Sequence, residues 1–148
     1  MKGRVPVFVL PSGAGGQTGP GAVRSKYNLV LVFLGSGRVS EAEQYLLDLA
    51  AVNPGILAEQ GRVMAVVGLD IEAARETASR LVLPYPLLAD EDASVAARML
   101  GEPGACALCV ADRYGEVYCM ETALTPSDLP STRSALEWLQ YIQSECPE

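Results

Sequence analysis

The sequence has no histidine among its 148 residues. Histidine is the commonest general base and metal ligand, so its absence excludes Ser-His-Asp and Cys-His catalytic sites. Positive charge is also scarce, because eleven Lys and Arg face eighteen Asp and Glu and give a formal net charge of −7. Such a charge repels nucleic acids and anionic membranes, and we expect neither of them as a partner.

Long hydrophobic runs are missing as well. The longest, LVLVFL and VMAVVGL, have six or seven residues, whereas a membrane-spanning helix needs about 20. Pro6 and Pro11 bracket the first apolar run and no cleavage site follows it, so we expect no signal peptide. With 49% hydrophobic residues, the chain is predicted to form one domain over 1–148, in the cytoplasm and with reduced thiols.

The first half of the sequence predicts strands separated by a loop. Alternating hydrophobicity indicates a first strand over 5–10, and the Gly-rich stretch over 11–26 is expected to be a flexible loop. Continuous apolar runs at 28–34 and 62–69 are typical of central strands that are buried on both faces.

Helix signals lie between and after these two runs. Ser40 is the candidate N-cap of the first helix, and acidic residues follow it in the first turn. Pro54 and Gly55 should break or kink this helix. Asp70 is placed to cap a second, shorter helix. The order predicted so far is β, β-α-β, α.

The second half predicts a short helix, a hairpin and a final helix. The short helix should end at Gly101, and the DRYG turn at 112–115 should connect two strands. The final helix is expected over 131–144. This arrangement predicts an α/β protein with a thioredoxin-like fold, in which a mixed central sheet has helices on both faces.

Three segments carry a resemblance to a known family. NLVLVFL at 28–34, YPLLADEDASVAARMLG at 85–101 and LCVADRYGEVY at 108–118 resemble, in order and spacing, segments of the peroxiredoxin family. This alkyl hydroperoxide reductase and thiol-specific antioxidant (redoxin) family belongs to the thioredoxin-fold superfamily. The resemblance implies a thioredoxin-like fold, an antioxidant oxidoreductase role and a homodimer.

The resemblance also implies a catalytic cysteine that this sequence lacks. In active members a cysteine lies in the first turn of the helix after the first central strand, inside a Pro-x-x-x-Thr-x-x-Cys loop, where the helix N-terminus lowers the thiol pKa. The matching position is about Arg38 or Val39, and no cysteine precedes Cys106. Cys106 also takes the place of the family's cis-proline, and Tyr118 that of its activating arginine. We therefore expect a degenerate active site in a binding or assembly module.

Four cysteines leave a second hypothesis open. Cys106 and Cys109 have CxxC spacing, but on an extended strand their Cα atoms would lie about 10 Å apart with side chains on opposite faces, beyond disulfide reach. Cys119 could lie opposite or diagonal to Cys109 on the next strand. Cys146 is expected just past the final helix and partly exposed. The alternative function is a thiol-dependent oxidoreductase that uses a displaced cysteine such as Cys106 or Cys146, with Cys109 as a further candidate.

We expect no cofactor and no metal, because a zinc site needs two turn-like knuckles and the sequence has a single CxxC on a strand. An unknown protein or a small anion could be a partner. Backbone N–H groups and a guanidinium could hold a phosphate or carboxylate at the start of the first helix, at Gly35, Ser36, Gly37, Arg38, Val39 and Ser40. A plain turn into a capped helix is the alternative there. The acidic cluster of Asp90, Glu91 and Asp92 is expected to cap a helix or to be solvated.

Overall fold

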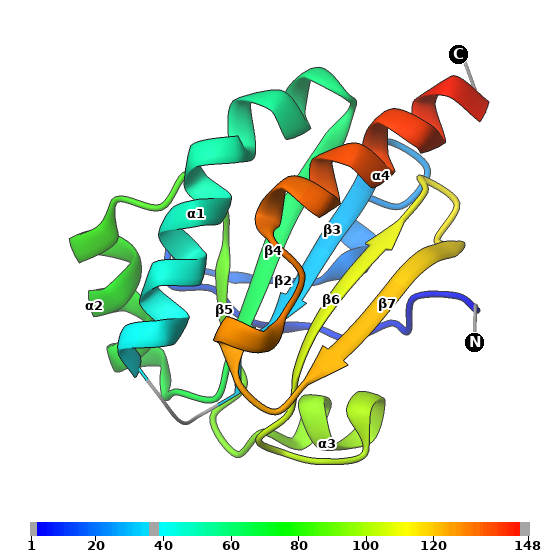
Figure 1. The fold of residues 1–148 in the computed structure, drawn as a ribbon. Coiled ribbons are helices and arrows are strands. Elements are labelled where there is room, and N and C mark those ends of the chain that lie inside the picture. Colours follow the sequence, from blue (N-terminus) through cyan, green and yellow to red (C-terminus); the bar gives the residue numbers. More distant parts are fainter. Residues whose placement is uncertain (1–2, 36–38, 146–148) are drawn as a thin grey trace.

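The computed structural model describes residues 3–35 and 39–145. Its centre is a five-stranded mixed sheet with the strand order β5-β4-β3-β6-β7 (Figure 1). Strands β5, β4 and β3 are parallel to one another, whereas β6 is antiparallel to both β3 and β7. The strands are β3 (Asn28–Phe33), β4 (Gly61–Val67), β5 (Leu87–Ala89), β6 (Cys106–Ala111) and β7 (Val117–Ala123).

Helices cover both faces of this sheet, as predicted. They are α1 (Val39–Ala58), α2 (Ile71–Leu81), α3 (Ser94–Leu100) and α4 (Thr132–Glu145). Side chains of α1, α2 and α4 belong to one core cluster, and α1 and α4 lie side by side (Figure 1). Side chains of α3 and of the N-terminal segment form the second cluster on the opposite face.

The two core clusters explain the uninterrupted apolar sequence of β3 after Asn28. Val30 and Val32 pack into the cluster with α1 and α4, whereas Leu31 and Phe33 pack into the cluster with α3. Each of these side chains is at most 1% exposed, and burial of one such side chain contributes about 1.5–3 kcal/mol. This strand, which is buried on both faces, therefore has no polar position from Leu29 to Phe33.

The predicted strand over 5–10 is wrong. Val5 and Phe8 are both buried, a three-residue spacing that does not fit the two-residue alternation of a strand. Pro6 has no N–H group for a strand ladder. In the described part of the N-terminal segment, pairing is limited to a two-residue antiparallel ladder of β1 (Leu10–Pro11) and β2 (Gln17–Thr18) and to isolated bridges from Arg4 to Glu116 and from Ser12 to Leu88.

The Gly-rich stretch over 11–26 contains regular structure. It includes β2 and the 3-10 helix η1 (Pro20–Ala22). Ser12 and Gly13 are buried, and the Gly13 N–H donates a hydrogen bond to the Leu87 carbonyl at 2.9 Å. This stretch therefore packs against the β5 edge of the sheet, and its flexibility stays a prediction.

The first helix differs from expectation at both ends. α1 begins at Val39, so Ser40 is its second residue and not its N-cap. The helix also continues through Pro54 to Ala58, so the expected break is wrong. A proline removes one helical hydrogen bond and costs about 3 kcal/mol. The buried residues Leu49 and Ile56, each fully shielded from solvent, hold the helix on the sheet on both sides of this position.

Other local predictions are confirmed. The Asp70 carboxylate accepts a hydrogen bond from the Ala73 N–H at 2.8 Å and caps α2. Gly101 ends α3 in the left-handed conformation, with a φ of 84°. The hairpin turn is closed by a 2.9 Å hydrogen bond from the Gly115 N–H to the Asp112 carbonyl. These signals depend on neighbours within a few residues, which sequence spacing captures well.

The acidic cluster before α3 caps that helix, as expected. Asp90 is only 2% exposed, and its carboxylate accepts hydrogen bonds from the Val95 and Ala96 N–H groups at 3.2 and 2.9 Å. Asp92 accepts one from the Ser94 N–H at 3.1 Å. The hydrogen bonds from Ser94 lower the pKa of Asp92. These carboxylates therefore have a structural role that accounts for their position.

Candidate functional site at the start of α1

The junction between β3 and α1 is tightly packed where it is described. Gly35 has a φ of 70°, and a Cβ added there would lie 2.7 Å from the Gly104 carbonyl oxygen and 3.6 Å from the Cys106 Sγ. The Gly35 carbonyl accepts a hydrogen bond from the Gly68 N–H at 3.1 Å. Both the conformation and the contact require glycine. The structure thus brings two predicted site residues, Gly35 and Cys106, next to each other.

The predicted anion site is only partly described. Ser36, Gly37 and Arg38 lie outside the described residues, whereas α1 starts at Val39 and Ser40 is exposed. The helix start would attract an anion through its free N–H groups. The anion site stays a prediction.

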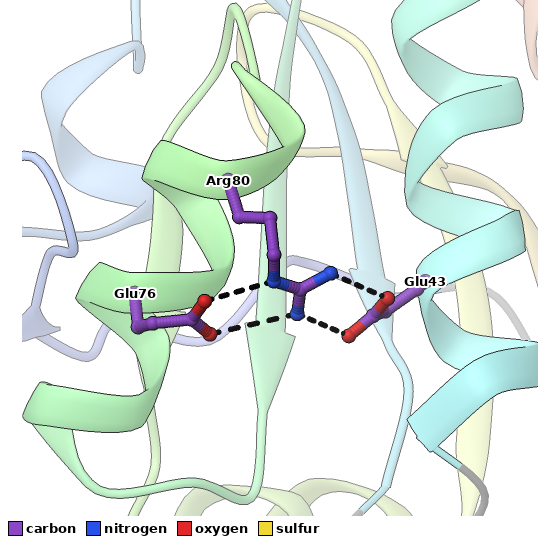
Figure 2. Close-up of polar contacts among 3 residues, drawn as sticks. All are labelled: Glu43, Glu76 and Arg80. Atoms are coloured by element: carbon purple, nitrogen blue, oxygen red, sulfur yellow. Dashed lines mark hydrogen bonds and ion pairs between the residues drawn. The ribbon is translucent and has the colours of Figure 1, made fainter.

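An ion-pair cluster ties the second turn of α1 to α2 (Figure 2). The Arg80 guanidinium donates hydrogen bonds to both carboxylate oxygens of Glu43, at 3.0 and 2.6 Å, and its Nε donates to Glu76 at 2.8 Å. The hydrogen bond from Arg80 holds the pKa of Glu43 below its usual range. The cluster positions the start of α1 against α2 and neutralises part of its negative charge.

A cleft of about 410 Å³ opens beside the first turns of α1. Its other wall is formed by the 3-10 helix η2 (Pro126–Asp128) and the start of α4. Glu41 and Asp48 line it together with the hydroxyl residues Ser127 and Thr132. The Ser127 hydroxyl donates a 3.4 Å hydrogen bond to Glu41. The carboxylates disfavour an anion in this cleft. Sequence reasoning missed it because its two walls are about 80 residues apart in the chain.

Cys106 and Cys109 face opposite sides of β6, as their spacing predicted. Cys106 packs into the core cluster with α1, and Cys109 packs into the cluster with α3. Burial, with a smaller effect of Glu41, raises the pKa of the Cys106 thiol to about 11. Burial, with a smaller effect of Cys119, raises the pKa of the Cys109 thiol to about 12. Because the thiolate is the nucleophile, both thiols are poorly suited to attack a substrate at neutral pH.

A β-bulge separates Cys119 from Cys109. The hairpin pairs Ala111 with Val117, a register that would place Cys119 opposite Cys109 if it continued. The register instead shifts by one residue, so that Cys119 lies opposite Val110. Cys119 consequently packs into the core cluster with α1, and Cys109 into the other. The considered cross-strand disulfide is therefore excluded by geometry, and all three described cysteines are free.

The same bulge directs Tyr118 towards α4. The Tyr118 ring lies 6.3 Å from the Tyr141 ring, and the Trp138 ring lies 5.9 Å from that of Tyr141, both in edge-to-face arrangements. These residues line a shallow cleft of about 470 Å³. Trp138 is partly buried, packs against the core cluster with α1 and also lines this open cleft.

The remaining predictions concern Cys146, metals and membranes. α4 ends at Glu145, and Cys146 lies outside the described residues. Among the described residues, no group of three or more cysteine, aspartate or glutamate side chains is arranged to hold a metal ion. In the same part of the chain, every helix is too short or too polar to cross a bilayer.

Comparison with solved structures identifies the fold class. The peroxidoxin BcpB of Mycobacterium tuberculosis is similar, with a TM-score of 0.80 and 18% identity over 95% of this chain and 96% of that chain. The bacterioferritin comigratory protein of Xanthomonas campestris has a TM-score of 0.78 and 16% identity, with 91% of each chain covered. A yeast mitochondrial 1-Cys peroxiredoxin has a TM-score of 0.83 and 12% identity, over 96% of this chain and 75% of that chain.

These similarities confirm the predicted thioredoxin-like fold, in the form found in peroxiredoxins. No protein-family model and no curated protein sequence matches the chain. At 12–18% identity, structural likeness establishes the architecture, and activity has to be argued from the site.

Proposed function

We propose that this chain is a peroxiredoxin-like protein that has lost peroxide reduction and acts as a binding or assembly module. One combination of observations carries the proposal. The sequence has no cysteine before Cys106, and burial keeps the thiols of Cys106 and Cys109 protonated at neutral pH. A peroxidase needs a thiolate that peroxide can reach. The inherited antioxidant role would then describe ancestry.

The fold neighbours define what would have been lost. The Xanthomonas campestris protein is described by its alkyl peroxide reduction activity, and the yeast protein by thiol resolution through glutathione and thioredoxin systems. Both descriptions depend on a reactive cysteine. In this chain, the alternative of a thiol-dependent oxidoreductase would need Cys106 to become accessible or Cys146 to be the nucleophile.

As partner we propose a second copy of the chain, docked along β7, or a different protein that uses the same surface. β7 is an edge strand of the sheet. Its first residue, Val117, donates a hydrogen bond to the Gly3 carbonyl at 2.8 Å, and the edge beyond it presents backbone groups for pairing. Met120, Leu124 and Tyr141 are 36%, 76% and 49% exposed on and around this edge. Sedimentation equilibrium of the wild type and of Met120→Lys tests the homodimer. We place the protein in the cytoplasm, where thiols stay reduced.

A brief peroxide pulse tests the loss of chemistry. The reduced protein is exposed to low-micromolar hydrogen peroxide for seconds, quenched, unfolded in urea so that buried thiols also react, alkylated and mapped by peptide mass spectrometry. We expect all four cysteines to remain alkylatable. Rapid loss of one free thiol would support the oxidoreductase alternative and would identify that cysteine as its nucleophile. The Mycobacterium tuberculosis peroxidoxin serves as the positive control.

A further inference from the structure

A second cleft, of about 250 Å³, lies away from the start of α1. It is formed by the C-terminal half of α1, the first half of β4, the N-terminal segment and the connection from α2 to β5. Asn53, which lines it, is fourteen residues beyond Val39, or about 21 Å along the helix axis. The cleft is therefore distinct from the candidate site described above.

Asn53 is a buried polar residue whose side chain lacks a hydrogen-bond partner within the described part of the chain. It is 5% exposed, yet no hydrogen bond of its amide occurs among those residues. In the same part of the chain, every fully enclosed side-chain nitrogen and oxygen has a partner. The Asn53 amide must therefore reach solvent through the cleft that it lines. A buried amide of this kind lowers the stability of the fold unless a ligand or a water molecule forms hydrogen bonds with it.

Arg62 supplies positive charge to the same cleft. Its guanidinium lies over the Tyr27 ring at 3.6 Å from the centroid, and one N–H group donates to the Gly61 carbonyl at 2.8 Å. Among the described residues no carboxylate lies within ion-pair distance of it, although the chain carries a net charge of −7. The stack and the hydrogen bond fix the guanidinium plane and leave further N–H donors available.

The rest of the cleft is mostly apolar. Arg62 is the one charged residue among those that line it, and the other polar groups belong to Asn53, Thr18 and the two tyrosines, Tyr27 and Tyr85. Tyr85 presents its ring, because its hydroxyl donates to the Leu46 carbonyl at 2.6 Å. Pro84 and Pro86 extend this wall. A cleft of this size takes a small ligand, with few polar groups that fix its orientation.

We propose that this cleft binds a small organic carboxylate with a flat apolar body, and that Arg62 and Asn53 hold the carboxylate group. Arginine N–H groups match a carboxylate in geometry and charge. The Asn53 amide adds a neutral donor, and the tyrosine and proline side chains cover the apolar body. The proposal does not depend on the loss of peroxide chemistry.

Titration with benzoate tests the proposal. The ¹H–¹⁵N spectrum of the full chain is followed at constant ionic strength, with benzamide as the neutral ligand of the same shape. We expect benzoate to shift the Asn53 side-chain amide and Arg62 Nε–H signals saturably, with a Kd of about 1 mM for a ligand of this size. Benzamide should bind at least about tenfold more weakly, because it lacks the charge. The absence of saturable shifts, or equal binding of both compounds, would overturn the proposal.

Two variants assign the binding to the named side chains. Arg62→Gln should weaken benzoate binding at least about tenfold. Arg133→Gln, which removes the same charge from an exposed position on α4 outside the cleft, should leave Kd unchanged within about twofold. Equally weakened benzoate binding in both variants would mean that benzoate responds only to net charge. Unchanged benzoate binding in Arg62→Gln would refute the proposed site.

Asn53→Leu separates binding from structural roles. Leucine has the same branched shape and a higher helix propensity, and it leaves no partnerless buried amide. It is larger than asparagine, but the cleft that Asn53 lines has room for the added atoms. We therefore expect Tm to rise by about 2 °C while benzoate affinity falls. A lower Tm would show that the amide has a structural hydrogen bond, and unchanged benzoate affinity would show that it does not contact the ligand. Either result would refute the assignment.

Discussion

Iodoacetamide should alkylate Cys106 in the folded protein about 300-fold more slowly than in the unfolded chain at pH 7. With a pKa of about 11, about 10⁻⁴ of this thiol is ionised, whereas an ordinary cysteine with a pKa of about 8.5 is about 3% ionised. Because only the thiolate attacks, the ratio of these fractions sets the ratio of rates for thiolates of equal nucleophilicity. For Cys109, whose pKa is about 12, the same reasoning predicts about 3,000-fold. Steric burial can only slow both reactions further.

Quenched-flow alkylation with peptide mapping measures each cysteine separately. The rate for Cys106 should rise about tenfold per pH unit from pH 7 to about pH 10, since the thiol titrates only near pH 11. The same chain in concentrated urea is the control, and there the cysteines should react at similar rates. A folded-state rate within about tenfold of the urea rate, with the circular dichroism spectrum unchanged, would refute the reasoning and would favour the oxidoreductase alternative.

Three further predictions concern stability and are measured by thermal or urea unfolding. Arg80→Met should lower Tm by about 2 °C, because two carboxylates lose their partner, and this decrease in Tm should become smaller in about 1 M salt. The control variant Arg75→Met removes one exposed ion pair within α2 and should change Tm less. Gly35→Ala should cost about 2 kcal/mol or more, because of its positive φ and the contact with a backbone carbonyl, whereas Gly21→Ala, with open space around it, should stay within about 0.5 kcal/mol. Asp90→Asn should cost about 1–2 kcal/mol by weakening the cap of α3. The stabilising role of these contacts would be contradicted if the two arginine variants had equal effects or if the two glycine variants had equal effects. It would also be contradicted if Asp90→Asn left the stability unchanged.

The hairpin shows where sequence reasoning reaches its limit. The turn at 112–115 was predicted from Asp112 and Gly115, whose hydrogen bond closes it. The cross-strand partner of Cys119 was not predicted, because one bulged residue shifts the register and exchanges the faces of the residues beyond it. Sequence spacing predicts that two strands pair, but a one-residue irregularity depends on how Tyr118 packs against α4.

The candidate sites depend even more on distant segments. Gly35 was selected for its place after a strand, and the structure adds the reason, which is the close approach of the chain before β6. The Glu43–Arg80 pair joins residues 37 positions apart, and no local pattern predicts such a meeting. No motif singles out Arg62 or Asn53 in the sequence, and the proposed role of both residues follows only from the cleft that they share.

The sequence by itself determined the order of helices from α1 to α4, the hairpin of β6 and β7, the two-sided burial of β3 and the caps of α2 and α3. These features follow from residue spacing and hydrogen bonding within about one helical turn or one strand. Sequence also determined that no cysteine stands at the start of α1. The tertiary structure decided the burial and pKa of the thiols, the register of Cys119, the ion-pair cluster on Arg80 and both clefts. Each of these results from side chains far apart in the chain, whose desolvation and contacts exist only after the helices have packed on the sheet.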